Sequence, residues 1–385
     1  MDIKREGFDD IRPFYDDEMQ AVIKQLIADP LFKKVMEVNF RSMNWNELKA
    51  KLLTFDNKYD FQQTIIKQTV FSVLEKNAKS VDCTGFENIS KSEACTYISN
   101  HRDIILDASI LCVLLLNAGY DTCEICLGDN LLIQPWISNL VRLNKGIIVK
   151  RSVGARQQYE VSKHLSEYIH FAINEKKQSV WIAQREGRAK NSDDKTQPSV
   201  LKMLSMGNEG DFLESISKVN ITPVSLSYEF DPSDYLKAEE FQLKRDFPDY
   251  KKTAEDDMKN MGSGILGYKG NIHFQIARPI NQLLSQIDKS ADKNEQVAQV
   301  AALIDKEIYL NYRFYPINYI AYDKLWGNNS YFKDKYTEEE KKEVENYFQQ
   351  QLNKINIPNK DIPFLTEKLL EMYAYPVKNY LNAVD

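Results

Sequence analysis

The sequence has no apolar run long enough to cross a membrane and few of the residues that interrupt regular structure. No stretch reaches the roughly 18 uninterrupted apolar residues that a membrane-spanning helix requires, and the first residues, MDIKREGFDD, form no apolar signal core. Gly (14) and Pro (12) are few among 385 residues, so disorder is not expected to dominate. We expect a globular, cytoplasmic chain with a sizeable core.

Cysteine is scarce, and there is no excess of positive charge. Five cysteines form neither an even nor a dense framework, which predicts reduced thiols. The isolated pair Cys123 and Cys126 lacks a second Cys or His pair at suitable spacing, so a structural role is favoured over a zinc or redox site. With 50 Lys and Arg against 56 Asp and Glu, the formal charge is -6. General nucleic-acid binding is therefore not expected, and a basic site must be concentrated.

Helical and β-rich segments divide the chain into three regions. Spaced apolar residues predict helices from about residue 8 to 80 and again from about 290. Between 95 and 280, six β-rich runs alternate with helix-like ones: ACTYIS, EICLG, GIIVK, SVWIAQ, ITPVSLSY and IHFQIA. This alternation predicts an α/β domain with a mostly parallel sheet flanked by helices. We assign an N-terminal helical region to 1–80, the α/β domain to 81–285 and a C-terminal helical region to 286–385.

Three segments that suggest other chemistry are interpreted as structural. GSGILG (262–267) has the letters of a dinucleotide fingerprint, but a charged segment precedes it and a strand-like run follows, so a flexible loop is expected. The charged segment 237–260 is expected to be a solvated helix or loop. His164 and His170 are expected on a helix face, since no further ligand lies at metal spacing.

A histidine and two aspartates stand between a strand-like run and an apolar helix-like run. His101 follows CTYISN, with Asp103 and Asp107 close behind. A histidine at a strand end can act as general base on a hydroxyl, and a carboxylate can fix its tautomer. Either aspartate can instead cap the apolar helix. Which carboxylate pairs with the histidine stays open at this point.

Basic residues follow two later strands, and arginine with glycine suits a phosphate because the guanidinium is planar and the glycine backbone can approach closely. The residues are Lys150 and Arg151 after one strand, and Arg185, Glu186, Gly187 and Arg188 after the other. Because the carboxyl ends of parallel strands meet at one edge of a sheet, we expect His101, Arg151 and Arg188 to converge there.

In this order, the segments resemble the glycerol-3-phosphate and lysophosphatidate acyltransferase family. SNHRDIILD looks like the family's first block, which is His, four residues and Asp, and GDNLLI with LVRLNKGIIVKRS is similar to the second. QREGRAK looks like the third block, and ITPVSLSYE is similar to the fourth. The resemblance covers about residues 95 to 280. One departure is that five residues, not four, separate His101 from Asp107.

The resemblance implies that His101 is the base, that Asp107, with Asp103 as the substitute, orients it, and that Arg151 and Arg188 bind the acceptor's phosphate. Glu186 and Gly187 would shape that pocket, and Lys150 and Arg185 are weaker candidates. The implied reaction moves an acyl group from acyl-CoA or acyl-ACP, a substrate and not a cofactor, to a hydroxyl of glycerol 3-phosphate or lysophosphatidate in phospholipid biosynthesis.

A small-molecule lipid acceptor, the acyl donor and peripheral contact with the cytoplasmic face of a membrane are the implied partners, with no nucleic acid. Neither a cofactor nor a metal is expected. Two alternatives stay open: a different lyso-lipid acceptor, such as an amino-acid-derived lipid, and a catalytically silent protein that binds lipid or acyl chains. The extra residue between His101 and Asp107 favours the silent protein.

Overall fold

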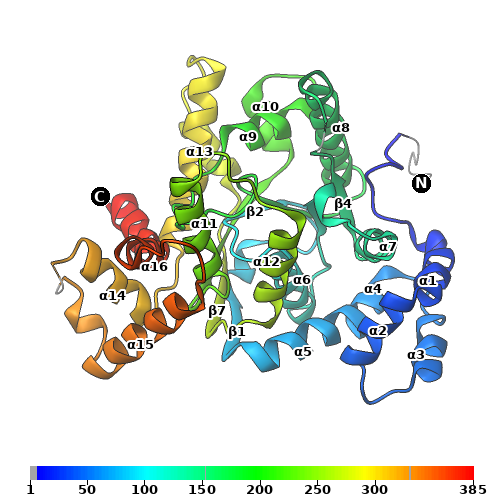
Figure 1. The fold of residues 1–385 in the computed structure, drawn as a ribbon. Coiled ribbons are helices and arrows are strands. Elements are labelled where there is room, and N and C mark those ends of the chain that lie inside the picture. The colour runs from blue at the N-terminus through cyan, green and yellow to red at the C-terminus, as the bar shows by residue number, and fades with distance from the viewer. Residues whose placement is uncertain (1–6, 152, 329–330) are drawn as a thin grey trace.

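The computed structural model of the chain describes residues 7–151, 153–328 and 331–385 (Figure 1). Seven strands form one sheet in the order β1-β7-β6-β2-β5-β3-β4. They are β1 (Ser80–Thr84), β2 (Thr96–Ser99), β3 (Glu124–Gly128), β4 (Gly146–Val149), β5 (Val180–Ala183), β6 (Ile221–Tyr228) and β7 (Asn271–Ile276). Every neighbouring pair is parallel except β6 and β7. The expected α/β fold with a mostly parallel sheet is confirmed.

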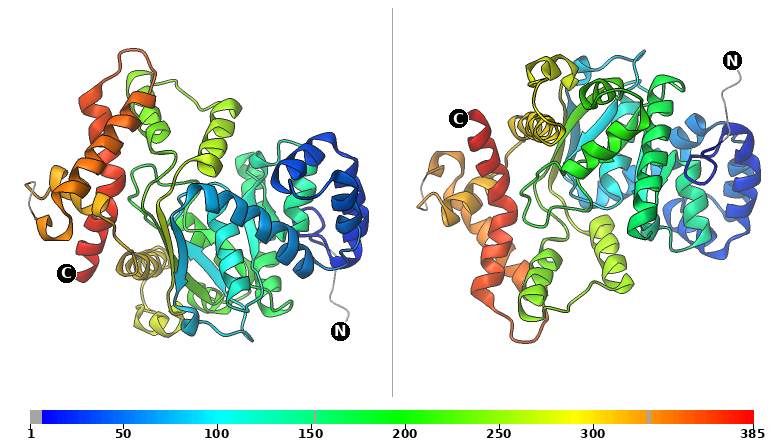
Figure 2. Two further views of the ribbon diagram at one scale, coloured as in Figure 1. Left: turned by 90° about the horizontal axis from the view of Figure 1, so that it is seen from below. Right: turned by 90° about the horizontal axis from the view of Figure 1, so that it is seen from above.

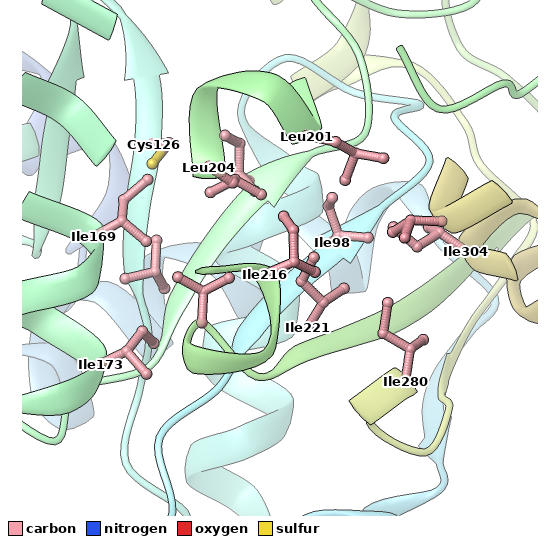
Figure 3. Close-up of a cluster of buried hydrophobic side chains, with 14 of the residues drawn as sticks. Ile98, Cys126, Ile169, Ile173, Leu201, Leu204, Ile216, Ile221, Ile280 and Ile304 are labelled. Atoms are coloured by element: carbon pink, nitrogen blue, oxygen red, sulfur yellow. The ribbon is translucent and has the colours of Figure 1, made fainter. Parts of the chain in front are cut away.

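Helices cover both faces of the sheet because neighbouring residues of a strand point to opposite sides. Ile98 and Ile182 belong to one core cluster, while Tyr97 and Trp181 belong to the other. The first cluster, drawn in part in Figure 3, packs the sheet against α8 (Ala155–Asn174), α9 (Pro198–Leu204), α10 (Phe212–Lys218) and α13 (Lys293–Leu310). The second packs it against α5 (Lys67–Asn77) and α6 (Leu106–Asn117). The segment ILDASILCVLLLN thus forms a helix buried against the sheet.

The N-terminal helices form a separate core with α7 (Pro135–Leu143). They are α1 (Met19–Ala28), α2 (Pro30–Asn39), α3 (Trp45–Leu52) and the short α4 (Lys58–Phe61). Polar residues begin these helices as the sequence favours: Asn44 accepts from the N–H of Glu47, and the Glu47 carboxylate accepts from the N–H of Asn44. Trp136 of α7 lies 6.1 Å from the ring of Phe32, so α7 joins this helical group to the sheet.

The C-terminal helices form a further core together with α11 (Asp234–Asp246). They are α14 (Pro316–Leu325), α15 (Glu338–Lys354) and α16 (Ile362–Val384). Figure 2 shows the N-terminal and C-terminal helices at opposite ends of the sheet. The segment between β6 and β7 carries α11, which packs against α15 and α16, and α12 (Ala254–Leu266), which contacts α5.

Two expectations for this segment are wrong. GSGILG is not a loop, because α12 continues to Leu266 and only Gly267 caps it; the reciprocal hydrogen bonds of Thr253 and Asp256 begin this helix upstream of the glycines. The charged segment 237–260 forms α11 and most of α12 but is not fully solvated. Lys237 and Glu240 are buried, and the charges are tolerated because Lys237 pairs with Asp231 and Glu240 with lysines.

The two histidines expected on a helix face do lie on one helix. His164 and His170 lie on α8, where His164 pairs with Asp10 and His170 contacts the Leu204 carbonyl. Within the described part of the chain, no helix is long and apolar enough to cross a membrane, and no three His, Cys, Asp or Glu side chains cluster as metal ligands. Cys123 and Cys126 are buried free thiols, with the Cys123 sulfur 3.5 Å from that of Cys112.

Candidate active site

The histidine after β2 is held directly against one of the two aspartates. His101 follows the last residues of β2, and α6 begins at Leu106 with Asp107 in its first turn. The Nδ1 atom of His101 lies 2.7 Å from Oδ2 of Asp107. Since an ionised carboxylate only accepts hydrogen bonds, the proton belongs on Nδ1 and the lone pair on Nε2. The other edge of the imidazole is thereby left as a proton acceptor.

The Asp107 carboxylate is fully buried and is satisfied by protein donors. Oδ2 also accepts from the backbone N–H groups of Arg102 (2.7 Å) and Asp103 (3.0 Å), and Oδ1 accepts from the hydroxyl of Tyr228 (2.9 Å). Tyr228 ends β6, which lies beside β2 in the sheet. With these donors the carboxylate has one orientation, so it also fixes the plane of the histidine ring.

Asp103 has a different task. Its Oδ1 accepts from the N–H groups of Ile105 and Leu106 at 2.9 and 2.7 Å, so it caps the start of α6. Burial, together with the negative charge of Asp107, raises the pKa of Asp103. In this structure Asp107 pairs with His101, and Asp103 holds the turn that presents it.

Helix α12 approaches this turn through a glycine. A Cβ atom built on Gly264 would lie 2.1 Å from Oδ2 of Asp103, which real side chains do not allow. The buried ammonium of Lys269 holds the same end of α12 by donating to the carbonyl of Gly267 at 2.7 Å. Gly264, one of the three glycines that look like a nucleotide motif, therefore allows the close approach of a helix to the histidine turn.

A buried ion pair between Arg102 and Asp194 holds the turn that carries His101. The guanidinium of Arg102 donates to both oxygens of Asp194, at 2.9 and 2.5 Å, and the hydroxyl of Tyr312 donates to Asp194 at 2.6 Å. The ring of Trp181, from β5, lies edge-on to the ring of His101 with the ring centroids 5.8 Å apart. The histidine side chain is 13% exposed, so it is largely buried and yet remains in contact with solvent.

The basic residues expected at this edge separate into three groups. Arg151 after β4 approaches Glu186, with 3.9 Å between Nη1 and Oε1, and its backbone N–H donates to Asp129. Arg188 instead donates to Oδ1 of Asn260 on α12 at 3.0 Å. Lys150 is turned away to an ion pair with Asp10. The structure thus brings Arg151 and Glu186 together and places Arg188 on the α12 side.

Residues 184–187, which follow β5 and precede Arg188, have the features of a binding loop. Gly187 has a φ of +69°, a conformation that favours glycine. Beside it, the Nε atom of Arg185 and both amide atoms of Gln184 are buried without a hydrogen-bond partner among the described residues. Unpaired buried polar groups cost free energy unless a water or a ligand satisfies them. This loop therefore has hydrogen-bonding capacity to offer a ligand.

Residues 80–227 match the model of the family described as Acyltransferase. This segment is similar to that family. The match agrees with the family resemblance carried by the four sequence blocks, and the matched segment contains both His101 and Asp107. No curated protein matches the chain.

Among solved structures, the chain is similar to the crystal structure of the 1-acyl-sn-glycerophosphate (LPA) acyltransferase PlsC from Thermotoga maritima. The identity is 12%, the TM-score is 0.36, and the similarity covers 74% of this chain and 91% of that chain.

Sequence reasoning missed the residues that support the His101–Asp107 pair. Tyr228 stands at the end of an expected strand, but only the order of strands reveals that β6 lies beside β2. Asp194 lies 92 residues from Arg102 in a loop, and no local pattern links them. The sequence around Gly264 resembles a nucleotide-binding motif, but in the structure Gly264 allows α12 to pack closely on Asp103.

Proposed function

We propose that this acyltransferase moves a fatty acyl group from a thioester donor, acyl-CoA or acyl-ACP, to a hydroxyl of glycerol 3-phosphate or lysophosphatidate. The single observation that carries the proposal is the hydrogen bond between His101 and a buried, fully satisfied Asp107 at the carboxyl end of a parallel sheet. The alternative of a silent binding protein rested on the extra residue between them. That residue is absorbed in the turn, because Asp107 still reaches Nδ1 at 2.7 Å.

In the proposed reaction, Nε2 of His101 accepts the proton of the acceptor hydroxyl while the oxygen attacks the thioester carbonyl carbon. Asp107 stabilises the imidazolium that forms. Collapse of the tetrahedral intermediate breaks the carbon–sulfur bond, and the histidine proton passes to the departing thiolate. The products are an ester and a free thiol, and no acyl-enzyme intermediate is needed.

The loop after β5 supports a binding site for the phosphate group of the acceptor. We assign Arg151 and Arg188 to the phosphate, with Glu186 and Gly187 shaping the pocket and the unpartnered Nε of Arg185 as a further donor. Lys150 contributes least, since Asp10 already pairs with it. Arg151→Ala and Arg188→Ala should each raise the acceptor KM about tenfold or more while the donor KM changes less. Unchanged acceptor kinetics in both variants would contradict the assignment.

We also propose peripheral contact with the cytoplasmic face of a membrane, because substrate and product are lipids. The surface that supports this is on α2, where Leu31, Val35 and Val38 are all exposed, four and three residues apart. These positions lie on one face of a helix, and Lys34 adds a positive charge suited to anionic lipid. Liposome flotation tests the contact, and a Leu31→Ser, Val35→Ser double variant should float less than the wild type.

The deciding experiment measures release of free thiol from acyl-CoA and acyl-ACP by the wild type and His101→Ala. Glycerol 3-phosphate, lysophosphatidate and an amino-acid-derived lyso-lipid serve as acceptors. Acceptor-dependent release that disappears in the variant supports the proposal, and the best acceptor identifies the substrate class. Turnover that survives in His101→Ala would reject the histidine as base, and no turnover by the wild type with any acceptor would favour a binding protein.

A further inference from the structure

Three lysines converge on one buried carboxylate near the active site. Glu240 of α11 has a side chain only 4% exposed. It pairs with Lys190 from the loop after β5, with Lys244 one turn along α11 (2.9 Å) and with Lys252 just before α12 (3.2 Å). Burial and the nearby ammonium groups of Lys244 and Lys252 lower the pKa of Lys190 to about 7. The protein therefore holds like charges together here against their repulsion.

The charges of this cluster do not cancel. Lys252 also lies 3.8 Å from Asp257, and Asp256 is close enough to act on its charge, so three carboxylates face the three lysines. Arg188 adds a fourth cation, and its charge lowers the pKa values of both Lys190 and Lys252. This group of cations is partly open to solvent, since the Lys244 side chain is 52% exposed. A phosphate dianion would relieve this repulsion and accept several charge-assisted hydrogen bonds.

Helix α12 connects the lysine cluster to the catalytic turn. Lys252 immediately precedes Thr253, the N-cap of α12, and Gly264 near the other end packs on Asp103. Asn260, between them, accepts from Arg188. Gly264 lies eleven positions after Thr253, and a helix rising 1.5 Å per residue spans about 16 Å over that stretch.

An acyl thioester donor has a similar span between its sulfur and its nearest phosphate. The pantetheine arm joins them through roughly thirteen bonds, the equivalent of about four residues of extended backbone, or ~15 Å. A donor lying along α12 with its thioester carbonyl at His101 would bring its phosphate to the lysine cluster. The acceptor phosphate, in contrast, belongs to a short molecule and must bind much closer to the histidine.

We propose that Lys190, Lys244 and Lys252 bind the phosphate of the donor's phosphopantetheine arm, and that α12 sets the distance from this phosphate to His101. The inference rests on the proposed acyl transfer and assigns its donor site. Coenzyme A and acyl carrier protein share this phosphate, so the same lysines serve either source. The adenosine phosphates of coenzyme A and the acidic surface of a carrier protein would bind outside the cluster.

The test is a double variant that keeps the buried carboxylate paired. Lys244→Gln with Lys252→Gln removes two ammonium groups but leaves Lys190 on Glu240. The matched control is Lys251→Gln with Lys259→Gln, which makes the same change in net charge at two exposed lysines of the same region. Circular dichroism and thermal unfolding first establish that both double variants are folded.

Initial rates are then measured with acyl-CoA, with an acyl carrier protein thioester and with an acyl-pantetheine that has no phosphate. We expect the KM of both phosphorylated donors to rise about tenfold or more in Lys244→Gln/Lys252→Gln. The KM of acyl-pantetheine, the acceptor KM and kcat should change less than twofold, and the control should match the wild type. A rise with acyl-CoA alone would place another phosphate of coenzyme A at the cluster and overturn the assignment, as would unchanged donor kinetics.

Calorimetric titration with free coenzyme A separates this inference from the proposed function. If the wild type turns over no acceptor, the proposed function fails. Coenzyme A binding by the wild type that weakens about tenfold in the lysine variant, but not in the control, would still support the phosphate site. Equal binding to all three proteins, or none to the wild type, would overturn it.

Discussion

Two glycines in α12 lie in opposite environments, although they are only two residues apart, and they should respond oppositely to the same substitution. A Cβ on Gly262 meets nothing within 4 Å, whereas a Cβ on Gly264 would lie 2.1 Å from Oδ2 of Asp103. Replacing a glycine by alanine inside a helix usually stabilises by about 0.5–1 kcal/mol. Gly262→Ala should therefore raise the free energy of unfolding by about that amount.

Gly264→Ala gains the same helix term but must displace Asp103. That side chain is 2% exposed, and its other oxygen is held by the N–H groups of Ile105 and Leu106, so it cannot rotate away without breaking the cap of α6. Overpacking of this kind costs about 1–3 kcal/mol. After the helix term is subtracted, we expect a net loss of about 0.5–2 kcal/mol.

Urea denaturation followed by fluorescence and by circular dichroism measures both variants under one condition. The two changes should differ by about 1–3 kcal/mol and have opposite signs. Gly264→Ala should also lower kcat, because the displaced turn carries His101, while Gly262→Ala should not. Equal effects of the two substitutions on stability would refute the conclusion that α12 is packed tightly on the catalytic turn.

Three further predictions concern buried carboxylates. Asp107→Asn should reduce kcat by about 10³-fold, measured by thiol release, because an amide stabilises the histidine tautomer and its cationic form poorly; an effect below tenfold would remove Asp107 from the mechanism. Asp194→Asn should cost about 3–5 kcal/mol in urea denaturation, since it leaves the Arg102 guanidinium buried without its partner charge, and a loss under 1 kcal/mol would show that the pair is not needed. For Asp234, burial and the charge of Asp231 raise the pKa to about 7. Between about pH 4 and pH 7 the Asp234 carboxyl therefore keeps its proton in the folded protein, whereas in the unfolded chain, with an ordinary pKa near 3.9, it has lost that proton. The contribution of Asp234 to the free energy of unfolding is thus complete below about pH 4 and is lost as pH rises towards 7. Asp234→Asn should flatten this fall in a pH series of unfolding measurements, and identical pH profiles would contradict the shift.

Local patterns predicted most of the strands, and the exceptions have physical causes. The six β-rich runs became β2 to β7 because each is apolar and short enough to cross a buried sheet. β1 has alternating exposed and half-buried residues and lies at the sheet edge, so its sequence, SVDCT, lacks the apolar signal of the others. The glycines of α12 predicted a loop because glycine favours flexible backbone. In the structure, Thr253 and Asp256 begin a helix upstream of them, and the contact with Asp103 leaves no room for a side chain at position 264.

The candidate site shows the same division between local and long-range information. His101 and Asp107 are six residues apart, so one turn of chain determines their contact. Tyr228, Asp194 and Asn260 reach the site from distant segments, and only the strand order and the α11–α12 segment bring them there. The His101–Asp107 pair was therefore visible in the sequence, while the groups that orient it were not. This explains why two arginines predicted to act together have different neighbours. Arg151 follows β4 and lies beside the loop after β5, whereas Arg188 contacts α12, an element that packs against α5 and against the turn that carries His101.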